Sequence, residues 1–120
     1  MKTWAVVGLG NNPERAAFGV AKLLQDKGHR IIPVYPRAET VHDEVGYKTL
    51  SEIPGPVDVV DCFVNSTLVG KVVDEAIAIG AKAVWLQLDV IDNDAIARAQ
   101  AAGLITVMDR CPAIEYRKKS

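Results

Sequence analysis

The sequence contains few cysteines and histidines, and this shortage excludes several kinds of site. Its 120 residues include two cysteines and two histidines. Cys62 and Cys111 lie far apart and form no C-x-x-C motif, so the sequence has neither a disulfide framework nor the ligand spacing of a zinc site. The lack of a disulfide framework agrees with a reducing compartment. We therefore expect a cytoplasmic protein that binds no metal.

The sequence also lacks an excess of charge of either sign and lacks long apolar runs. Lys and Arg number 14 against 15 Asp and Glu, for a net charge of -1. A near-neutral chain has no basic stripe of the kind that binds nucleic acid. No uncharged apolar run approaches the ~20 residues of a membrane span, and the first residues do not resemble a signal peptide. We expect neither nucleic acid nor membrane as a partner.

The composition that is present is typical of a soluble globular domain. Hydrophobic residues make up 49% of the chain and charged residues 24%. A chain of this length has the size of one ordinary domain. We expect residues 1–120 to form a single domain with room for one nucleotide-sized ligand.

Apolar segments of two kinds alternate along the chain. Short β-rich runs predict strands over residues 3–8, 30–35, 57–64, 82–88 and 104–108. Helical periodicity predicts helices over residues 17–27, 65–79 and 92–102, a short helical turn over 49–53 and a last turn within 109–120. Parallel strands need crossover connections, and helical crossovers cover both sheet faces. The pattern predicts an α/β chain with a three-layer Rossmann-like fold, whose five-stranded, mostly parallel sheet carries helices on both faces.

The turn after the first predicted strand has features of a phosphate-binding turn. In such sheets ligands bind beyond the carboxyl ends of the strands. Gly8 and Gly10 allow a close backbone approach, and the following helix offers N–H groups and partial positive charge. Pro13 stands at the third glycine of the dinucleotide fingerprint, so the motif is incomplete and a plain tight turn is the alternative. Arg15 is a candidate phosphate partner in this turn.

The end of the second predicted strand bears a cation where many NAD-binding domains bear an acid. The residues there are Val34, Tyr35, Pro36 and Arg37. The guanidinium of Arg37 is suited to a ribose-linked phosphate, which both NADP and coenzyme A carry. A solvated loop charge is the alternative.

No group of residues in the sequence forms a recognisable catalytic site. Asp58 and Asp61 fall on opposite faces of the third predicted strand, and we expect Asp61 to take a capping or turn-binding role near the ligand end. Cys111 has no nearby histidine to act as its base, so we expect a buried packing thiol, as for Cys62. We expect no catalytic residues.

Several runs together resemble the small single-domain CoA-binding proteins. These are WAVVG at 4–8, NNPER at 11–15, VYP at 34–36, WLQL at 85–88 and MDRCPAIE at 108–115. The chain is also similar to the CoA-binding domain of the succinyl-CoA synthetase α subunit. The resemblance implies coenzyme A as ligand. Carried over by position, the candidate binding residues are Gly8, Leu9, Gly10, Asn12, Arg15 and Ala17 at the phosphates, Val34, Tyr35, Pro36 and Arg37 at the adenosine, and Phe63 and Val64 bordering the nucleotide.

The chain departs from this family pattern at the phosphates. Family members often have a serine at position 10 and another at position 17, where this chain has Gly10 and Ala17. The synthetases also hold their phosphorylated histidine in a second domain. The resemblance therefore implies a protein that binds CoA or acyl-CoA as a non-catalytic carrier or sensor. The alternatives are an enzyme acting on CoA thioesters and an NADP-type nucleotide-binding domain. A homodimer through a sheet edge or residues 116–120 is a further possibility.

Overall fold

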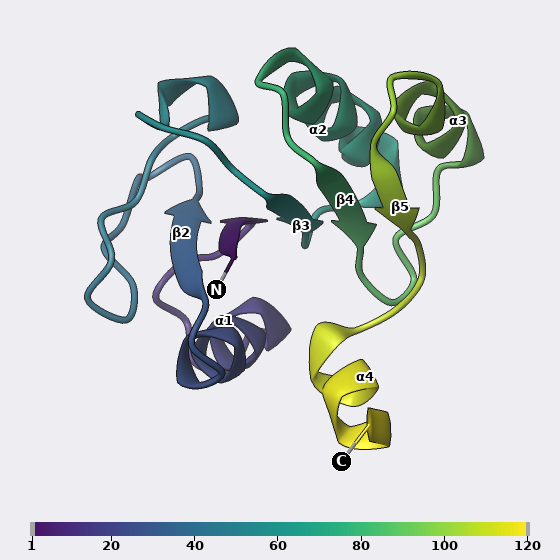
Figure 1. Cartoon of the computed structure of the whole chain (residues 1–120). Helices are drawn as coiled ribbons and strands as arrows, with labels where there is room; N and C mark the ends of the chain where they lie inside the picture. Colours follow the sequence, from purple (N-terminus) through teal and green to yellow (C-terminus); the bar gives the residue numbers. More distant parts are fainter. Residues whose placement is uncertain (1, 120) are drawn as a thin grey trace.

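Five parallel strands form one sheet with the order β2-β1-β3-β4-β5 (Figure 1). The computed structural model describes residues 2–119. The strands are β1 (Thr3–Val7), β2 (Arg30–Val34), β3 (Val59–Cys62), β4 (Ala83–Leu86) and β5 (Ile105–Val107). The helices are α1 (Ala16–Asp26), α2 (Ser66–Ala78), α3 (Asn93–Ala101), α4 (Pro112–Lys119) and the short 3-10 helix η1 (Leu50–Glu52). The predicted Rossmann-like fold class is confirmed.

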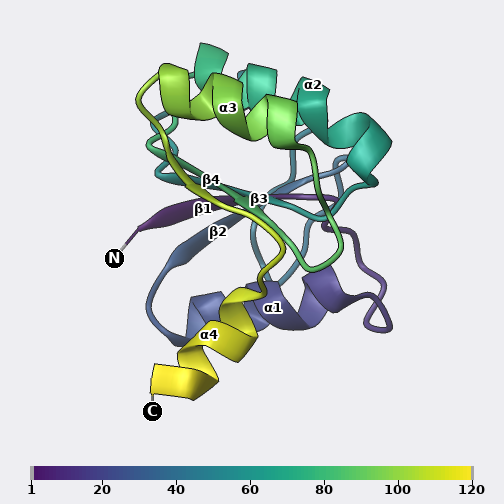
Figure 2. The ribbon, with the colours of Figure 1, turned by 90° about the vertical axis from the view of Figure 1, so that its right-hand side faces the viewer.

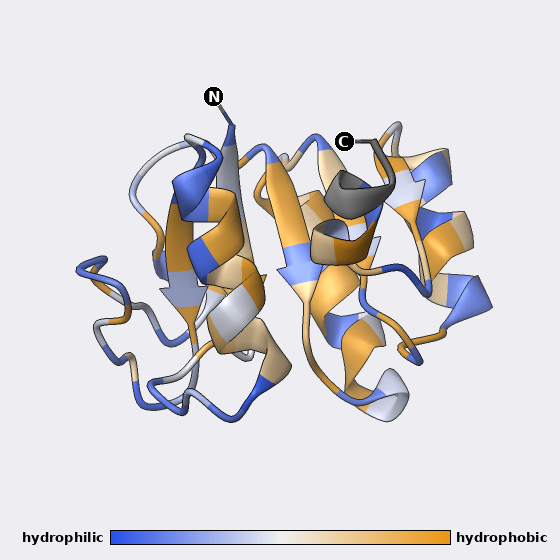
Figure 3. Cartoon of the chain, turned by 90° about the horizontal axis from the view of Figure 1, so that it is seen from below, coloured by the Kyte–Doolittle hydropathy of each residue, from blue (hydrophilic) through white to orange (hydrophobic). Residues whose placement is uncertain are grey.

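The helices lie in two layers on opposite faces of the sheet (Figure 2). One apolar cluster joins the sheet to α2 and α3 through residues such as Val60, Val73 and Ala99. The other joins it to α1 through residues such as Val6, Val20 and Leu24. The strands are coloured mostly as apolar in Figure 3, as expected of parallel strands that are covered on both faces.

The last helix is longer than the single turn that the sequence predicts. Its residues have a weak helical pattern, but Ala113 packs against the α1-side cluster. The indole N–H of Trp85 donates to the carbonyl of Arg110 at 2.8 Å and holds the approach to α4. Tertiary packing thus supports a helix that its own pattern does not indicate. Residue 120, part of the suggested dimer contact, lies outside the described residues.

The irregular segment between β2 and η1 is tied down at several points. Tyr47 runs beside β2, where its backbone N–H donates to Pro33 and its carbonyl accepts from Tyr35, each at 2.9 Å. Val41 is fully buried against the α1-side cluster. The His42 ring contacts α1, with Nε2 2.8 Å from the carbonyl oxygen of Phe18. These contacts fold the segment back over the start of α1 and so shape the site described next.

No helix among residues 2–119 combines the length and the apolar character needed to cross a membrane.

Candidate functional site

A groove of about 730 Å³ crosses the carboxyl ends of β2, β1, β3 and β4. The strand order reverses between β1 and β3, and open α/β sheets bind ligands at this switch point. It is lined by Val7, the last residue of β1, by Gly8 directly after it, and by Phe63 and Val64 after β3. The remaining lining residues are Arg15, Ala16, Ala17, Val34, Tyr35, Pro36, Lys48, Thr49, Asn65, Leu68, Lys71, Val72, Glu75, Gln87, Leu88, Val90 and Cys111.

A smaller pocket of about 260 Å³ adjoins the groove beside the turn between β1 and α1. The two cavities share Gly8, Arg15 and Tyr35. The other residues of the pocket are Gly10, Asn11, Asn12, Arg37 and Glu39. The pocket therefore brings the first βα turn, the end of β2 and the following loop to one place.

Gly8 is required by the close approach of two chain segments. Its φ is +99°, and a Cβ at this position would lie 2.3 Å from the carbonyl oxygen of Phe63. The N–H of Gly8 donates to Val34 at 2.8 Å, and the N–H of Phe63 donates to Val7 at 2.8 Å. The turn is thus fixed between the ends of β2 and β3, and any side chain here would force them apart.

All of the binding residues predicted from the sequence except Leu9 line the groove, the pocket or both. Gly10, Asn12 and Arg37 line the pocket. Ala17, Val34, Pro36, Phe63 and Val64 line the groove, and Gly8, Arg15 and Tyr35 line both. Leu9 is fully buried in the core against α1, backbone included, so it lines neither cavity.

Several cations around these cavities have no acidic partner. Arg15, Arg37, Lys48 and Lys71 line the cavities, and none of them belongs to an ion pair within residues 2–119. Ala16 and Ala17 begin α1 at the same place, and the first turn of a helix has N–H groups without intrahelical acceptors. The first turn of α1 contains no acidic residue. Cationic side chains and a helix start together favour an anionic ligand.

Glu39 is a pocket residue that the sequence reasoning missed. In NAD-binding domains an acid is expected at the tip of the second strand, and Glu39 lies beyond the tip of β2, in the irregular segment. The fold returns its carboxylate to the first turn, where Oε1 accepts from the N–H of Asn11 at 2.7 Å. The amide of Asn11 in turn donates to the carbonyl of Thr40. The pocket thus contains one carboxylate among its cations.

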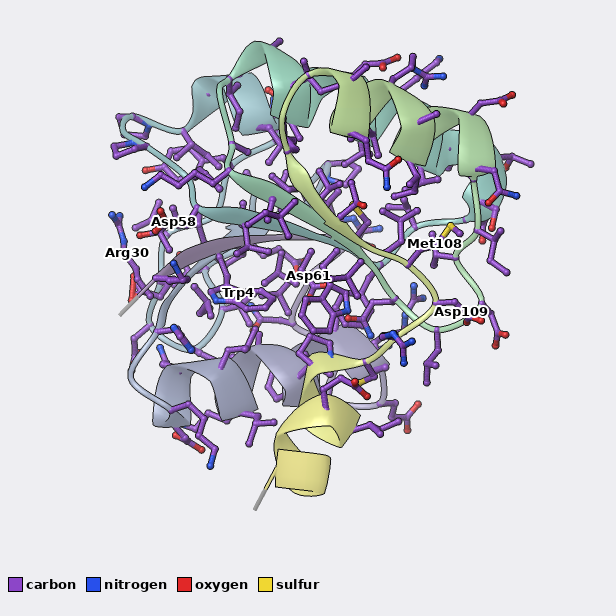
Figure 4. All side chains as sticks on the ribbon, turned by 45° about the vertical axis from the view of Figure 1, so that its right-hand side comes forward. Trp4, Arg30, Asp58, Asp61, Met108 and Asp109 are labelled. Atoms are coloured by element: carbon purple, nitrogen blue, oxygen red, sulfur yellow. The ribbon has the colours of Figure 1, made fainter. Side chains whose placement is uncertain are left out.

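Asp61 does not take the predicted capping or turn-binding role. It is fully buried, on the α1 side of the sheet, as Figure 4 shows. With the amide of Gln87 turned so that Nε2 faces the carboxyl group, Nε2 donates to Asp61 Oδ1 at 2.8 Å and lies 3.3 Å from Oδ2. Burial raises the pKa of Asp61 well above its usual range. Asp61 is therefore a buried acid that reaches the groove only through Gln87.

The two cysteines lie in different environments. Cys62 is fully buried as predicted, and burial raises the pKa of its thiol. Cys111 is partly exposed in the groove rather than buried, because the chain turns into α4 at this point. The prediction of a buried packing thiol holds for Cys62; Cys111 packs against the α1-side cluster as predicted but is only partly buried.

The fold and the groove define a Rossmann-like α/β domain with a groove at the switch point of its sheet. Within this class, residues 2–117 match the family described as "CoA binding domain". The chain belongs to this family.

Similar proteins include chains of comparable length and a subunit of a ligase. The chain is 35% identical over 113 residues to "Uncharacterized protein YneT" of Bacillus subtilis (strain 168), a match that covers 92% of this chain and 82% of that one. It is 35% identical over 81 residues to "Acetate--CoA ligase [ADP-forming] II subunit alpha" of Pyrococcus furiosus, covering 67% of this chain and 18% of that subunit. The solved structure "hypothetical protein from Pyrococcus horikoshii OT3" has a TM-score of 0.93 and 38% identity, over 98% of this chain and 82% of the other.

Proposed function

We propose that the whole chain is a single cytoplasmic domain that binds coenzyme A or an acyl-CoA without catalysing a reaction. The observation that carries this proposal is the set of unpaired cations and the α1 start in a groove at the switch point. Membership of the CoA-binding family supports the choice of coenzyme A among nucleotides.

The residues suggest where each part of the ligand binds. The pyrophosphate would lie against Gly8, Gly10 and the start of α1, with Arg15 as a charged partner. Val34, Tyr35 and Pro36 would contact the adenine, because they form the wall of the groove at the end of β2. Arg37 in the adjoining pocket would bind the ribose phosphate. Phe63 and Val64 would then border the chain that leads from the pyrophosphate to the thiol.

The absence of catalysis is proposed because the reactive groups of β3 lie away from the groove and because Cys111, which lines the groove, has no histidine near it in the sequence to act as its base. Asp61 and Cys62 are both fully buried, so neither side chain reaches a ligand in the groove. The raised pKa of Cys62 also keeps its thiol protonated and weakly nucleophilic. The ligase subunit is more than five times longer than the segment it shares with this chain, which spans 18% of it. Its ligase activity is therefore not assigned to this chain.

Thermal denaturation with three ligands tests the proposal. Coenzyme A at about 100 times its Kd should stabilise the fold by ~2.7 kcal/mol, which corresponds to a Tm increase of about 10 °C or more. Dephospho-CoA should bind more weakly, since it lacks the phosphate assigned to Arg37. Protection by NADPH but not by coenzyme A would refute the proposal.

A pair of arginine variants tests the role of Arg37. Arg37→Gln should reduce the affinity for coenzyme A about tenfold, because a charge-assisted hydrogen bond contributes ~1.5–3 kcal/mol, and it should leave the affinity for dephospho-CoA unchanged. Arg30→Gln is the matched control, since Arg30 is exposed at the other end of β2. Equal losses for both ligands in the Arg37 variant would remove its assignment to the ribose phosphate.

A further inference from the structure

The groove has an apolar region at its β4 end that the proposed CoA site does not use. Leu68 and Leu88 are about half exposed, with relative accessibilities of 52% and 47%, and both line the groove. Val72 and Val90 line it beside them. Large exposed leucines that share one concave surface are characteristic of a binding site for apolar groups.

The backbone around Leu88 is held in a fixed conformation. The residue after it, Asp89, has a φ of +66°, which is uncommon for a residue other than glycine. Its N–H donates to Asp109 Oδ1 at 2.7 Å. Ser66 Oγ at the start of α2 accepts from the N–H of Ile91 at 2.9 Å and donates to the carbonyl of Asp89 at 3.3 Å. These bonds fix the loop after β4 to α2, so the exposure of Leu88 is built into the fold.

Helix α2, which bears Leu68, also lines the charged part of the groove. Leu68, Lys71, Val72 and Glu75 all line the groove, and their spacing places them on one face of α2. The apolar region is therefore continuous with the cationic part of the groove. A ligand that fits the whole groove has an anionic portion and an apolar portion.

The direction of the proposed ligand places its thiol end in this region. With the ribose phosphate beside β2 and the pyrophosphate at β1 and α1, the remaining arm extends over β3 toward β4. Neighbouring strands are ~4.8 Å apart, so the ends of β1 and β4 are separated by about 10 Å in the order β1-β3-β4. The extended arm of coenzyme A is longer than this separation, so the thiol and any group attached to it reach the β4 end of the groove, where Leu68 and Leu88 lie.

We propose that Leu68 and Leu88 form a binding surface for an apolar acyl chain, and that the preferred ligand is an acyl-CoA with a chain of several carbons rather than free coenzyme A. This inference rests on the proposed function. We assign an acyl chain to this surface because, in an acyl-CoA, the chain is joined covalently to the anionic part of the ligand, which fits the rest of the groove.

Isothermal titration with coenzyme A, acetyl-CoA and hexanoyl-CoA tests the inference. Hexanoyl-CoA should bind at least tenfold more tightly than coenzyme A, equivalent to ~1.4 kcal/mol and less than the transfer free energy of two buried methylene groups. Acetyl-CoA should fall between them. Equal affinities for coenzyme A and hexanoyl-CoA would overturn the inference but not the proposed function, whereas failure of both ligands to bind would overturn both.

Two variants locate the acyl chain. In Leu68→Asn/Leu88→Asn the ratio of the Kd of coenzyme A to that of hexanoyl-CoA should fall below threefold. Ile105→Asn is the matched control, because Ile105 is an equally apolar side chain, 69% exposed on β5 and outside the groove, and the ratio should stay at tenfold or more. A ratio that persists in the double variant places the chain elsewhere and overturns the inference. A change of oligomeric state in the double variant, measured by sedimentation, also overturns the inference. Such a change means that the two leucines contact a second copy of the chain.

Discussion

The buried acid Asp61 should make the protein less stable as the pH rises. The carboxyl group is fully buried on β3, and its pKa is raised well above 3.8 by burial. An unfolded chain releases this proton near pH 4, whereas the folded chain keeps it to a higher pH. The folded state therefore binds one more proton between these two pKa values. The contribution of this bound proton to the free energy of unfolding is complete below about pH 4, and it is lost as the pH rises through the pKa of Asp61 in the folded state.

The size of this pH effect follows from the difference of one bound proton between the folded and unfolded states. Within that window the free energy of unfolding should decrease by up to ~1.4 kcal/mol per pH unit and then level off above the folded pKa. Asp61→Asn removes the titration and preserves the shape, and its amide oxygen still accepts from Gln87. The variant should be more stable than the parent above pH 7, and its stability should lack this slope.

Urea unfolding from pH 4 to pH 9, followed by tryptophan fluorescence, measures the difference. Asp58→Asn is the matched control, because Asp58 lies at the amino end of the sheet, accepts from the N–H of Thr3 at 2.8 Å and pairs with Lys82 at 3.5 Å. The Thr3 hydrogen bond lowers the pKa of Asp58, so its contribution is present above pH 4 and lost in acid, the opposite sense. If Asp61→Asn and the parent give parallel curves, the carboxyl group is not titrating in the buried state and the reasoning fails.

Two further predictions concern the first turn. Glu39→Gln should strengthen binding of coenzyme A about five- to tenfold in titration calorimetry, because a carboxylate beside phosphate costs ~1 kcal/mol or more. Unchanged or weaker binding would contradict the repulsive role of Glu39. Gly8→Ala should lower the free energy of unfolding by about 3 kcal/mol, because its Cβ meets the backbone oxygen of Phe63 at 2.3 Å. Gly19→Ala in α1, where a Cβ meets nothing within 4 Å, should instead stabilise by ~0.5–1 kcal/mol in the same denaturant assay.

Local signals in the sequence were sufficient for most of the fold. Short β-rich apolar runs bounded by glycine, proline or polar residues predicted all five strands, because parallel strands are buried on both faces and their ends require turns. Asp92, the first residue of the helix predicted over 92–102, caps α3, and its Oδ1 accepts from the N–H of Ala95 at 3.0 Å. These features depend on neighbours in the chain, which a sequence shows directly.

The parts that the sequence did not predict depend on long-range contacts. Asp61 and Gln87 are 26 positions apart, and nothing in either local pattern indicates that one side chain satisfies the other. Glu39 reaches Asn11 only because Val41 is buried and His42 contacts α1. The exposure of Leu88 depends on hydrogen bonds that the loop after β4 donates to Asp109, between β5 and α4, and to Ser66 on α2. Each of these contacts can be deduced only once the arrangement of the strands and loops in the fold is known.

Gly10 and Glu39 lie in contact at one of the positions where the chain departs from the family pattern. A serine at position 10 would add a hydroxyl toward a phosphate, and its absence alone suggests a weaker site. A Cβ at Gly10, however, would lie 2.9 Å from Glu39 Oε1 and 3.4 Å from the ring of Tyr35. The space that a serine side chain would need is therefore taken by the carboxylate that accepts from Asn11. A serine at position 10 therefore requires the flexible side chain of Glu39 to shift by a small amount, at the expense of its hydrogen bond to the N–H of Asn11. The turn of this chain carries a carboxylate that an incoming phosphate must face or displace.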